Sequence, residues 1–541
     1  MNSPNPLLEV KNLQVSFASQ NKVVDDISFN IYRGETFALV GESGSGKSIT
    51  ALSVLRLLPY AAKMRAGILS LQGTNLLAIP EIDFAKIRSR RIGLIFQDSM
   101  SALNPVMTIG EQIAEVLNLH FQLAKQNCQQ QVLELLEQVE IPDPKRRINE
   151  YPHQMSGGQR QRVMIAMALA GKPDLLIADE PTTALDVTIQ AQVLTLMKNL
   201  QKKTGMALWI ITHDLALVSN IADRIAVMQQ GKIVETANTR TFFEHPQHPY
   251  SLKLLAAQPD MNSCLQKNND ASSTLLQVND LKVYYPIRAG IFKRIVGHVK
   301  AVDGVSFSLQ KGKTLAMVGE SGCGKTSLGK SLLNLTEAGE GHIVFDGVEL
   351  QQSRSSDLHR RCTEMQIIFQ DPFSAMNPRM LVGDIVEEGL RSLRPEFNDE
   401  QRKSRVAKLL QQVDLPANSA LRYPHEFSGG QRQRICIARA LAVEPKLIIC
   451  DEPTSALDVS VQAQIIALLK QLQKEQGLSY LLITHNFGVV AEMADEVAVM
   501  YKGKIVEQGM VEQVLMHPQH EYTQSLLQAV PKIDFSKSNL Q

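Results

Sequence analysis

Short, mainly apolar runs recur along this chain at the same spacing in its two halves. Residues 36–40 and 314–318 have the length and composition of buried strands, and so do residues 175–178 and 447–450. Glycine-rich or acidic residues follow each run. The pattern predicts strands of an α/β sheet, with the polar residues at the carboxyl ends, where open α/β sheets bind ligands.

Helical periodicity appears between and after these strands. The residues after Lys47 and Lys325 continue into apolar-periodic sequence, and residues 109–117 and 132–139 place apolar side chains at helical spacing. We therefore expect a strand, a glycine loop and a helix to converge near each lysine. A separate helical region should lie upstream of residue 156.

One long segment of the sequence occurs twice. MSGGQRQR at residues 155–162 returns as FSGGQRQR at 427–434, and LIADEPTTALDV and IICDEPTSALDV follow the two copies at the same offset. Such a repeat indicates a duplicated module, and 541 residues exceed what one hydrophobic core normally organises. We expect α/β domains at residues 1–257 and 275–541, joined by a flexible polar linker at 258–274.

Composition narrows the class of protein. The chain has 56 basic and 55 acidic residues, and a net charge of +1 gives no global field favouring nucleic acid, so we expect no nucleic-acid partner. The N-terminal residues lack the pattern of a signal peptide, and no apolar run approaches the roughly 18 to 20 residues of a spanning helix. A soluble or membrane-peripheral chain is expected. Six scattered cysteines fit a reducing cytoplasm, and Cys323 and Cys450 should be small buried side chains.

Two glycine-rich segments, GESGSGKS at residues 41–48 and GESGCGKT at 319–326, fit the phosphate-binding pattern GxxxxGK[ST]. Glycines at these positions let backbone N–H groups turn inward around phosphate, and the following helix N-terminus favours negative charge. The lysines should reach the β- and γ-phosphates of ATP, and the final hydroxyls can bind Mg²⁺. The ATP-binding candidates here are Gly41, Ser43, Gly44, Gly46, Lys47 and Ser48, with Gly319, Ser321, Gly322, Gly324, Lys325 and Thr326.

Adjacent acidic residues end a later predicted strand in each half. Asp179 and Asp451 should hold Mg²⁺ together with Ser48 and Thr326, while the glutamate after each aspartate can orient or deprotonate the attacking water. A histidine at the same distance beyond each aspartate can hydrogen-bond the γ-phosphate, and a glutamine ending another apolar strand can sense Mg²⁺ or water. The catalytic candidates are Glu180, Glu452, His213, His485, Gln97 and Gln370. Because both halves keep the glutamate and the histidine, we expect two hydrolytically competent sites.

The repeated SGGQ segments predict a second anion-binding element in each half. The serine caps a helix, the glycines permit close approach, and the QRQR run begins the helix. A module with one nucleotide pocket and a spare helix end suggests that pockets are completed across a dimer. The residues concerned are Ser156, Gly157, Gly158 and Gln159, with Ser428, Gly429, Gly430 and Gln431.

Together these residues resemble the ATP-binding-cassette (ABC) ATPases over nearly the whole chain. In that family Phe17 and Tyr285 would stack on adenine, and Asp186 and Asp458 would belong to the D-loops. The resemblance implies two P-loop ABC ATPase domains in a head-to-tail pseudo-dimer, each with a RecA-like α/β core, a helical subdomain and an antiparallel β subdomain. Lys47, Glu180 and His213 would then face residues 428–431, and Lys325, Glu452 and His485 would face residues 156–159.

A narrower resemblance is to the ATPases of bacterial oligopeptide and dipeptide importers. It rests on QDSMSALNP and QDPFSAMNP, and on HPQHPY at 245–250 and HPQHEY at 517–522. It implies two separate transmembrane permease subunits, a periplasmic or extracellular substrate-binding protein, and a peripheral place on the cytoplasmic face of the bacterial inner membrane. Dipeptides, longer peptides, glutathione, peptide antibiotics and nickel chelates all remain open as cargo. We expect no iron–sulfur cluster, because only Cys264 lies where some relatives carry a cysteine cluster.

Two further alternatives stay open in the sequence. Residues 286–300 contain a ten-residue expansion that the first half lacks, and its Arg288, Lys293, Arg294 and Lys300 among apolar residues fit either a solvated hairpin or a contact with a membrane or partner. The rival function is a soluble tandem cassette acting on ribosomes or DNA. The short polar linker and the absence of an inserted module in the sequence favour import.

Overall fold

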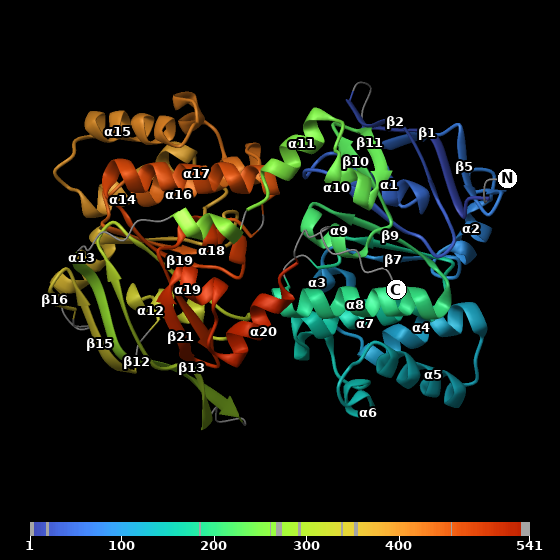
Figure 1. Cartoon of the computed structure of the whole chain (residues 1–541), viewed down its shortest axis with the longest axis horizontal. Helices are drawn as coiled ribbons and strands as arrows, with labels where there is room; N and C mark the ends of the chain where they lie inside the picture. The colour runs from blue at the N-terminus through green and yellow to red at the C-terminus, as the bar shows by residue number, and fades with distance from the viewer. Residues whose placement is uncertain are drawn as a thin grey trace. The chain divides into compact units, whose positions relative to one another are not determined.

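The computed structural model of the protein describes residues 5–17, 21–182, 185–259, 261–266, 273–289, 294–336, 339–350, 355–455 and 457–531. These residues form two compact units. Unit 1 holds the described residues up to Ala257 together with Pro531, and unit 2 holds those from Gln258 to Val530. In Figure 1 the strands and helices of unit 1 run from blue to green and those of unit 2 from green to red.

A six-stranded sheet forms the centre of unit 1, in the order β11-β10-β3-β9-β8-β7. Neighbouring strands in it are parallel except for the antiparallel pair β10 and β11. Alternate residues of β8 and β9 pack against α7 and α8 on one face and toward α1 on the other, which is why these strands are apolar along their length. The bounds are β3 Thr36–Val40, β7 Ile92–Ile95, β8 Leu175–Asp179, β9 Ala207–Thr212, β10 Arg224–Gln229 and β11 Lys232–Asn238.

An antiparallel sheet and a helical lobe complete unit 1. The sheet has the path β2-β1-β5-β6, with β4 paired to β1, and shares a hydrophobic cluster with the central sheet. Its strands are β1 Leu8–Phe17, β2 Asn21–Ile31, β4 Ala62–Arg65, β5 Ile68–Leu71 and β6 Thr74–Asn75. The lobe consists of α4 Ile109–Phe121, α5 Lys125–Gln138 and α6 Pro144–Arg147. The other helices are α1 Lys47–Val54, α2 Glu81–Ile87, α3 Ser99–Ala102, η1 Pro152–Gln154, α7 Gly157–Ala170, α8 Val187–Thr204, α9 Leu215–Ile221, α10 Thr239–Glu244 and α11 Pro249–Ala256.

Unit 2 repeats this architecture. Its central sheet has the order β17-β18-β19-β14-β20-β21, and its antiparallel sheet the order β13-β12-β15-β16. The strands are β12 Thr274–Ala289, β13 Arg294–Gln310, β14 Thr314–Val318, β15 Glu340–Phe345, β16 Val348–Glu349, β17 Met365–Ile368, β18 Leu447–Asp451, β19 Ser479–Ile483, β20 Glu496–Tyr501 and β21 Lys504–Met510. The helices are η2 Met261–Gln266, α12 Lys325–Leu332, α13 Ser355–Glu364, α14 Val382–Leu393, α15 Asp399–Gln412, η3 Ala417–Leu421, η4 Pro424–Glu426, α16 Gly429–Leu441, α17 Val459–Gln476, α18 Phe487–Met493, α19 Val511–Met516 and α20 Glu521–Ala529.

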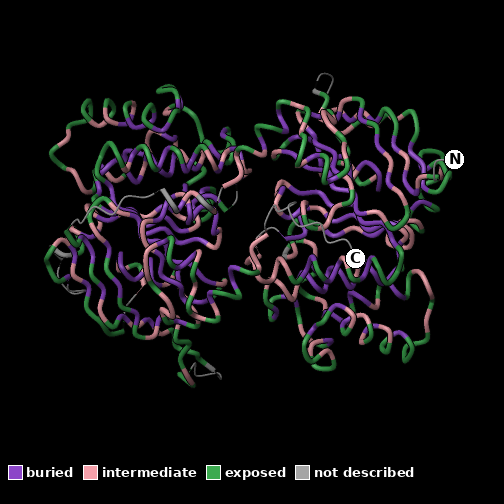
Figure 2. The backbone as a smooth tube through the Cα atoms, in the orientation of Figure 1, coloured by how far each residue is buried: buried purple, intermediate pink, exposed green. Residues whose placement is uncertain are grey.

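The predicted α/β class is confirmed in both units, each with a helical lobe and an antiparallel β sheet. Figure 2 shows buried residues gathered in the strands of each central sheet and exposed ones on the outer face of the lobes. Cys323 and Cys450 are buried, as expected. Among the helices that the structure describes, none combines the length and hydrophobicity needed to cross a bilayer.

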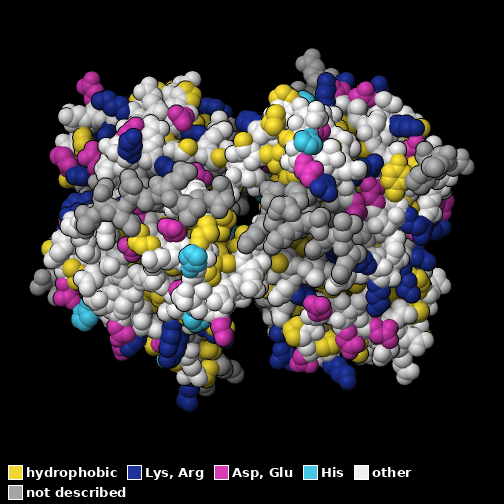
Figure 3. All heavy atoms as spheres, viewed as in Figure 1, with side chains coloured by type: hydrophobic (Ala, Val, Ile, Leu, Met, Phe, Trp, Pro, Cys, Tyr) yellow, Lys and Arg dark blue, Asp and Glu magenta, His cyan; other side chains and the backbone are white. Residues whose placement is uncertain are grey.

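The expansion at 286–300 lengthens one hairpin. β12 and β13 remain paired out to Ala289 and Arg294, whereas the equivalent pair in unit 1 ends at Phe17 and Asn21. Residues 290–293, which include Lys293, lie outside the described part. The rest is an exposed hairpin on which apolar and basic side chains mix (Figures 1 and 3), and its Val296 is 64% exposed. Exposed basic and apolar side chains are expected of both alternatives, a solvated hairpin and a contact with a membrane or partner.

Part of the expected linker is ordered. Met261–Gln266 form the 3₁₀ helix η2, which packs on α18 and buries Cys264 against the hydrophobic cluster of α18 and α19. A helix of this kind is too short for its sequence to show periodicity, so the polar composition of 258–274 gave no sign of it. Asp260 and residues 267–272 lie outside the described residues.

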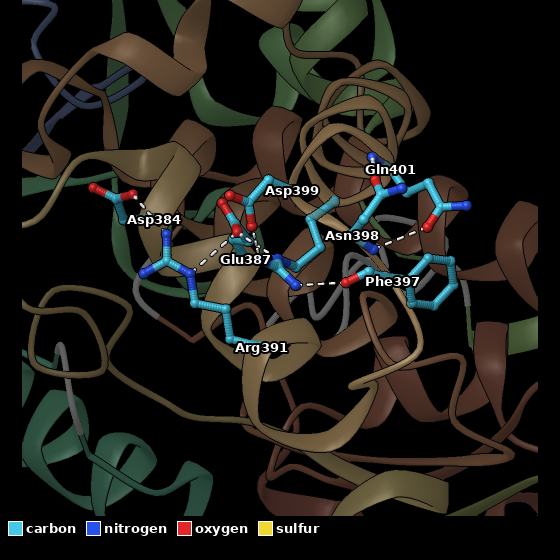
Figure 4. Close-up of polar contacts among 8 residues, drawn as sticks. Asp384, Glu387, Arg391, Phe397, Asn398, Asp399 and Gln401 are labelled. Atoms are coloured by element: carbon cyan, nitrogen blue, oxygen red, sulfur yellow. Dashed lines mark hydrogen bonds and ion pairs between the residues drawn. The ribbon is translucent and has the colours of Figure 1, made fainter.

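The helical lobes differ in their inner contacts. In unit 2 the buried Glu387 of α14 accepts hydrogen bonds from Arg391 Nε at 3.1 Å and from Arg402 Nε of α15 at 2.9 Å (Figure 4). Arg402 also binds the Phe397 carbonyl and Asp399. The equivalent positions of α4 and α5 in unit 1 hold Ala114 and Cys128, whose Sγ lies 3.9 Å from the Ala114 carbonyl.

Candidate active sites

The phosphate loop of unit 1 joins β3 to α1, and a glycine with left-handed backbone begins the helix. Gly46 has φ 106°, and a Cβ there would lie 2.6 Å from the Val23 carbonyl oxygen, so only glycine fits without a shift. Lys47, which follows it, is 5% exposed. Its Nζ donates to the carbonyls of Gly41 and Glu42, both at 2.8 Å. The lysine charge is therefore held against the loop, while Ser43 and Gly44 are exposed at its tip.

An aspartate at the end of β8 lies beside this loop. Ser48 Oγ donates to Asp179 Oδ1 at 3.0 Å. Burial raises the pKa of Asp179, and the neighbouring Glu180 charge adds to the rise, while the Ser48 hydrogen bond and Lys47 oppose it. Two oxygen atoms from separate elements, a hydroxyl and a poorly solvated carboxylate, thus lie side by side.

Glu180 lies at the centre of a three-residue cluster. Gln97 Nε2 donates to its Oε2 at 2.7 Å, and His213 Nδ1 lies 3.1 Å from its Oε1. The backbone of Glu180 is left-handed, with φ 46°, and its N–H donates to the Ile211 carbonyl. The left-handed region is uncommon for a residue other than glycine. The glutamate that sequence analysis singled out is therefore positioned through both its backbone and its carboxylate.

Unit 2 builds the same arrangement from β14, α12, β18 and β19. Lys325 Nζ donates to the Gly319 and Glu320 carbonyls at 2.7 and 2.9 Å, and Thr326 Oγ1 donates to Asp451 Oδ1 at 3.1 Å. Gln370 Nε2 donates to Glu452 Oε2 at 2.7 Å, and His485 Nδ1 lies 3.0 Å from Oε1. Glu452 also has left-handed backbone, with φ 48°.

The two carboxyls of unit 2 shift in opposite directions. Burial raises the pKa of Asp451, as in unit 1. Burial acts to raise the pKa of Glu452 as well, but the hydrogen bond from His485 and the nearby His485 and Lys325 charges outweigh it, so the pKa of Glu452 is lowered. Glu452 is therefore ionised near neutral pH.

The SGGQ segments begin long helices in both units. Ser156 and Ser428 cap α7 and α16, and each forms a reciprocal pair of hydrogen bonds with the glutamine three residues later. A Cβ on Gly158 would lie 2.6 Å from Ile189 Cγ2, and one on Gly430 would lie 2.4 Å from Val461 Cγ1. The second glycine therefore packs the helix start closely against α8 or α17. The expected pairing of each SGGQ segment with the other half's phosphate loop stays a prediction.

The remaining candidates lie around the same loops. Tyr285 projects from β12, and its hydroxyl is 3.3 Å from Ser327 Oγ on α12, directly after the phosphate loop. Phe17 ends β1 and packs partly buried at the edge of the unit 1 cluster. Asp186 and Asp458 are the N-cap residues of α8 and α17.

A tyrosine from the C-terminal part of each unit also contacts the phosphate loop, which the sequence did not predict. The backbone N–H of Glu42 donates to Tyr250 Oη at 3.2 Å, and that of Glu320 donates to Tyr522 Oη at 3.1 Å. Both tyrosines end the repeated HPQHPY and HPQHEY segments. The repetition of these segments was visible in the sequence, but their sequence distance from the loops concealed the contact.

Comparison with known proteins agrees with this geometry. Residues 24–183 and 302–455 match the ABC transporter family, which covers the phosphate loops and the acidic pairs of both units. Residues 234–283 and 506–541 match the C-terminal region of oligopeptide/dipeptide transporters, which includes both HPQ segments.

Relatives and solved structures extend the match along the chain. The peptidoglycan transport ATP-binding protein YejF of Agrobacterium fabrum is 47% identical, over 98% of this chain and 97% of its own. The glutathione import ATP-binding protein GsiA of Pectobacterium atrosepticum is 44% identical, over 98% of this chain and 90% of its own. An archaeal ribosome recycling factor, aABCE1, solved with the ribosomal stalk protein aP1, is 19% identical with a TM-score of 0.60, over 92% of this chain and 90% of that one, and shares the fold alone. The chain belongs to the ABC transporter family and is a tandem ABC ATPase.

Proposed function

We propose that this ATPase is the ATP-hydrolysing subunit of an importer for peptides or peptide-like compounds. The observation that carries the proposal is the pair of matches to the C-terminal region of oligopeptide/dipeptide transporters, one in each half. Relatives named for peptidoglycan transport and glutathione import, similar over almost the whole chain, support the same class of cargo. The choice among dipeptides, longer peptides, glutathione, peptide antibiotics and nickel chelates is left to experiment.

In each unit the residues around the glutamate are proposed to carry out ATP hydrolysis. Lys47 and Lys325 neutralise phosphate charge, and Glu180 and Glu452 take a proton from the attacking water. In unit 1, Gln97 holds one carboxylate oxygen and His213 the other, so the glutamate has one orientation. Catalysis of phosphoryl transfer rests mainly on positioning and electrostatics, which such a cluster supplies.

Mg²⁺ fits the hydroxyl and carboxylate beside each loop. In unit 1 these are Ser48 Oγ and Asp179 Oδ1, 3.0 Å apart, and in unit 2 Thr326 Oγ1 and Asp451 Oδ1, 3.1 Å apart. Hard oxygen ligands in small number suit Mg²⁺, which keeps several waters and binds substrate phosphates. The raised pKa of both aspartates indicates carboxylates that a cation would stabilise. When bound, the ion would neutralise charge on the phosphate oxygens; Gln97 and Gln370 are further candidate ligands through water.

Both sites are proposed to hydrolyse ATP. The support is that the two side-chain contacts of the unit 1 glutamate recur in unit 2, at 2.7 Å to the glutamine in both units and at 3.1 and 3.0 Å to the histidine. Neither cluster lacks the glutamate, the histidine or the glutamine.

The proposed partners are two transmembrane permease subunits and, through them, a periplasmic or extracellular substrate-binding protein. The chain would then lie peripherally on the cytoplasmic face of the inner membrane. The helical lobes are the proposed contacts with the permease. A cavity of about 770 Å³ in the unit 1 lobe is lined by Ala114 and Cys128 among others, where unit 2 instead holds the Glu387–Arg402 ion pair. Two chemically different lobes favour two non-identical permease surfaces.

Gentle detergent extraction and purification of the tagged full chain tests the proposal. Recovery of two membrane subunits, followed by ATP-dependent peptide uptake in vesicles with a peptide-loaded binding protein, is the expected result. Recovery of ribosomes without membrane subunits would refute import and favour the soluble class. Glu180→Gln with Glu452→Gln is the matched control, because the subunits should still co-purify while uptake stops.

A further inference from the structure

The HPQ segments reach from the C-terminal part of each unit to its own phosphate loop. In unit 1 the Tyr250 hydroxyl accepts a hydrogen bond from the Glu42 N–H, and the Glu42 carbonyl accepts one from Lys47 Nζ. Both the N–H and the carbonyl of Glu42 are therefore hydrogen-bonded. In unit 2, Tyr522 and Lys325 hold Glu320 in the same way.

A second set of contacts fixes the tyrosine. The Glu235 carboxylate on β11 accepts hydrogen bonds from the N–H groups of Gln247 and His248 at 2.9 and 3.0 Å. His248 Nδ1 accepts from the Tyr250 N–H at 3.2 Å and so caps α11. A continuous series of hydrogen bonds thus links β11, the turn before α11, the start of α11 and the Tyr250 hydroxyl to the phosphate loop.

Unit 2 repeats this series contact by contact. Glu507 accepts from the N–H groups of Gln519 and His520 at 2.8 and 3.1 Å, and His520 Nδ1 accepts from the Tyr522 N–H at 3.1 Å. The Tyr522 ring also lies against that of Tyr501, with centroids 4.2 Å apart. Tyr501 ends β20, and Gln229 takes this place at the end of β10 in unit 1.

We infer that Tyr250 and Tyr522 are positioning residues for ATP binding, and that the C-terminal part of each unit serves as a brace for its own phosphate loop. A phosphate loop binds through backbone N–H groups that must all point inward. The tyrosine hydroxyl accepts the hydrogen bond of the Glu42 or Glu320 N–H, so this N–H is not one of those that bind phosphate. The lysine Nζ donates to the carbonyl of the same residue. The loop is then organised before ATP arrives, and pre-organisation lowers the ordering cost of binding.

A role limited to packing would give a different pattern of effects. Tyr250 is 6% exposed, so its ring contributes burial that a phenylalanine would keep. Removal of the hydroxyl alone deletes the contact to Glu42. The inference rests on the proposed binding of ATP by the phosphate loops and not on the cargo.

The test compares hydroxyl deletions in the full chain carrying Glu180→Gln and Glu452→Gln, so that bound ATP is not consumed. Tyr250→Phe with Tyr522→Phe should raise the Kd for ATP with Mg²⁺ on the order of threefold to tenfold, the effect of one lost hydrogen bond per site. Hydrogen exchange at residues 41–46 and 319–324 should also become faster in the ATP-free chain. With the catalytic glutamates restored, KM for ATP should rise while kcat stays within about twofold.

Tyr480→Phe is the matched control. Its hydroxyl is also buried and donates to the Leu469 carbonyl at 2.9 Å, but it makes no contact with a phosphate loop, so its loss should lower thermal stability and leave the Kd unchanged. An unchanged Kd in the double tyrosine variant, or an equal rise in the Tyr480→Phe chain, would overturn the inference. Absence of ATP binding in the parent chain would overturn the phosphate-loop assignment and this inference together.

Discussion

Replacement of either proposed catalytic glutamate, Glu180 or Glu452, by glutamine should separate ATP binding from hydrolysis. In unit 1 a glutamine at 180 can keep both contacts, since its carbonyl can accept from Gln97 and its amide can donate to a neutral His213, at the positions now 2.7 and 3.1 Å away. Only the proton-accepting carboxylate is lost. Loss of a general base typically lowers the rate about 10²- to 10⁴-fold, which is about 2.7 to 5.5 kcal/mol of activation free energy. The affected site should therefore bind ATP normally and become nearly inactive.

Steady-state phosphate release at saturating ATP and Mg²⁺ measures the outcome in the chain. If the two sites turn over independently, Glu180→Gln and Glu452→Gln should each retain about half of the activity; if they alternate, each single change should remove almost all of it. The double variant sets the background, and binding of a fluorescent ATP analogue checks that the sites remain formed. A single variant that keeps more than about 90% of the turnover would refute two competent sites, because the unchanged site would then account for all of it.

Three further predictions concern the supporting structure. Glu387→Ala should destabilise the unit 2 lobe by about 1 to 3 kcal/mol, because the partly buried Arg402 loses its buried carboxylate partner while keeping Asp399. Adding Arg402→Cys should recover part of this loss, and hydrogen exchange in α14 and α15 is the measurement. Hydrogen bonds from two lysines lower the pKa of Asp346 to about 2, so its stabilising contribution is present above about pH 4 and lost as the pH falls toward 2. Asp346→Asn should cost about 1 kcal/mol or less at neutral pH, owing to solvent screening, and the difference should vanish in acid when exchange in β15 is followed. Gly46→Ala, whose Cβ would lie 2.6 Å from the Val23 carbonyl, should abolish ATP binding in unit 1 and spare unit 2, as measured with a fluorescent analogue.

Much of the fold and of the site geometry could be predicted because the informative residues lie within single strands, loops and helix starts. The apolar runs before Gly41 and Asp179 indicated the central strands, and the spacing in 109–117 indicated α4. The contact of Tyr250 with Glu42 could not be predicted, since it joins residues far apart in the sequence through a turn that only the folded chain forms. Nor could η2, because a single 3₁₀ helix has no detectable period.

The differences between the two units are as informative as their likeness. The clusters around Glu180 and Glu452 make the same contacts, with 2.7 Å to the glutamine in each and 3.1 and 3.0 Å to the histidine, as expected where both units perform the same chemistry. The helical lobes differ in one buried position, where unit 2 has the Glu387–Arg402 ion pair and unit 1 has Ala114 and Cys128. Among the described residues, the first hairpin is longer in unit 2, where it extends to Ala289. The two units thus share the contacts of the glutamate and differ in the interior of the helical lobe and in the length of the first hairpin. That contrast supports the proposal that one chain serves two non-identical membrane subunits with one chemistry.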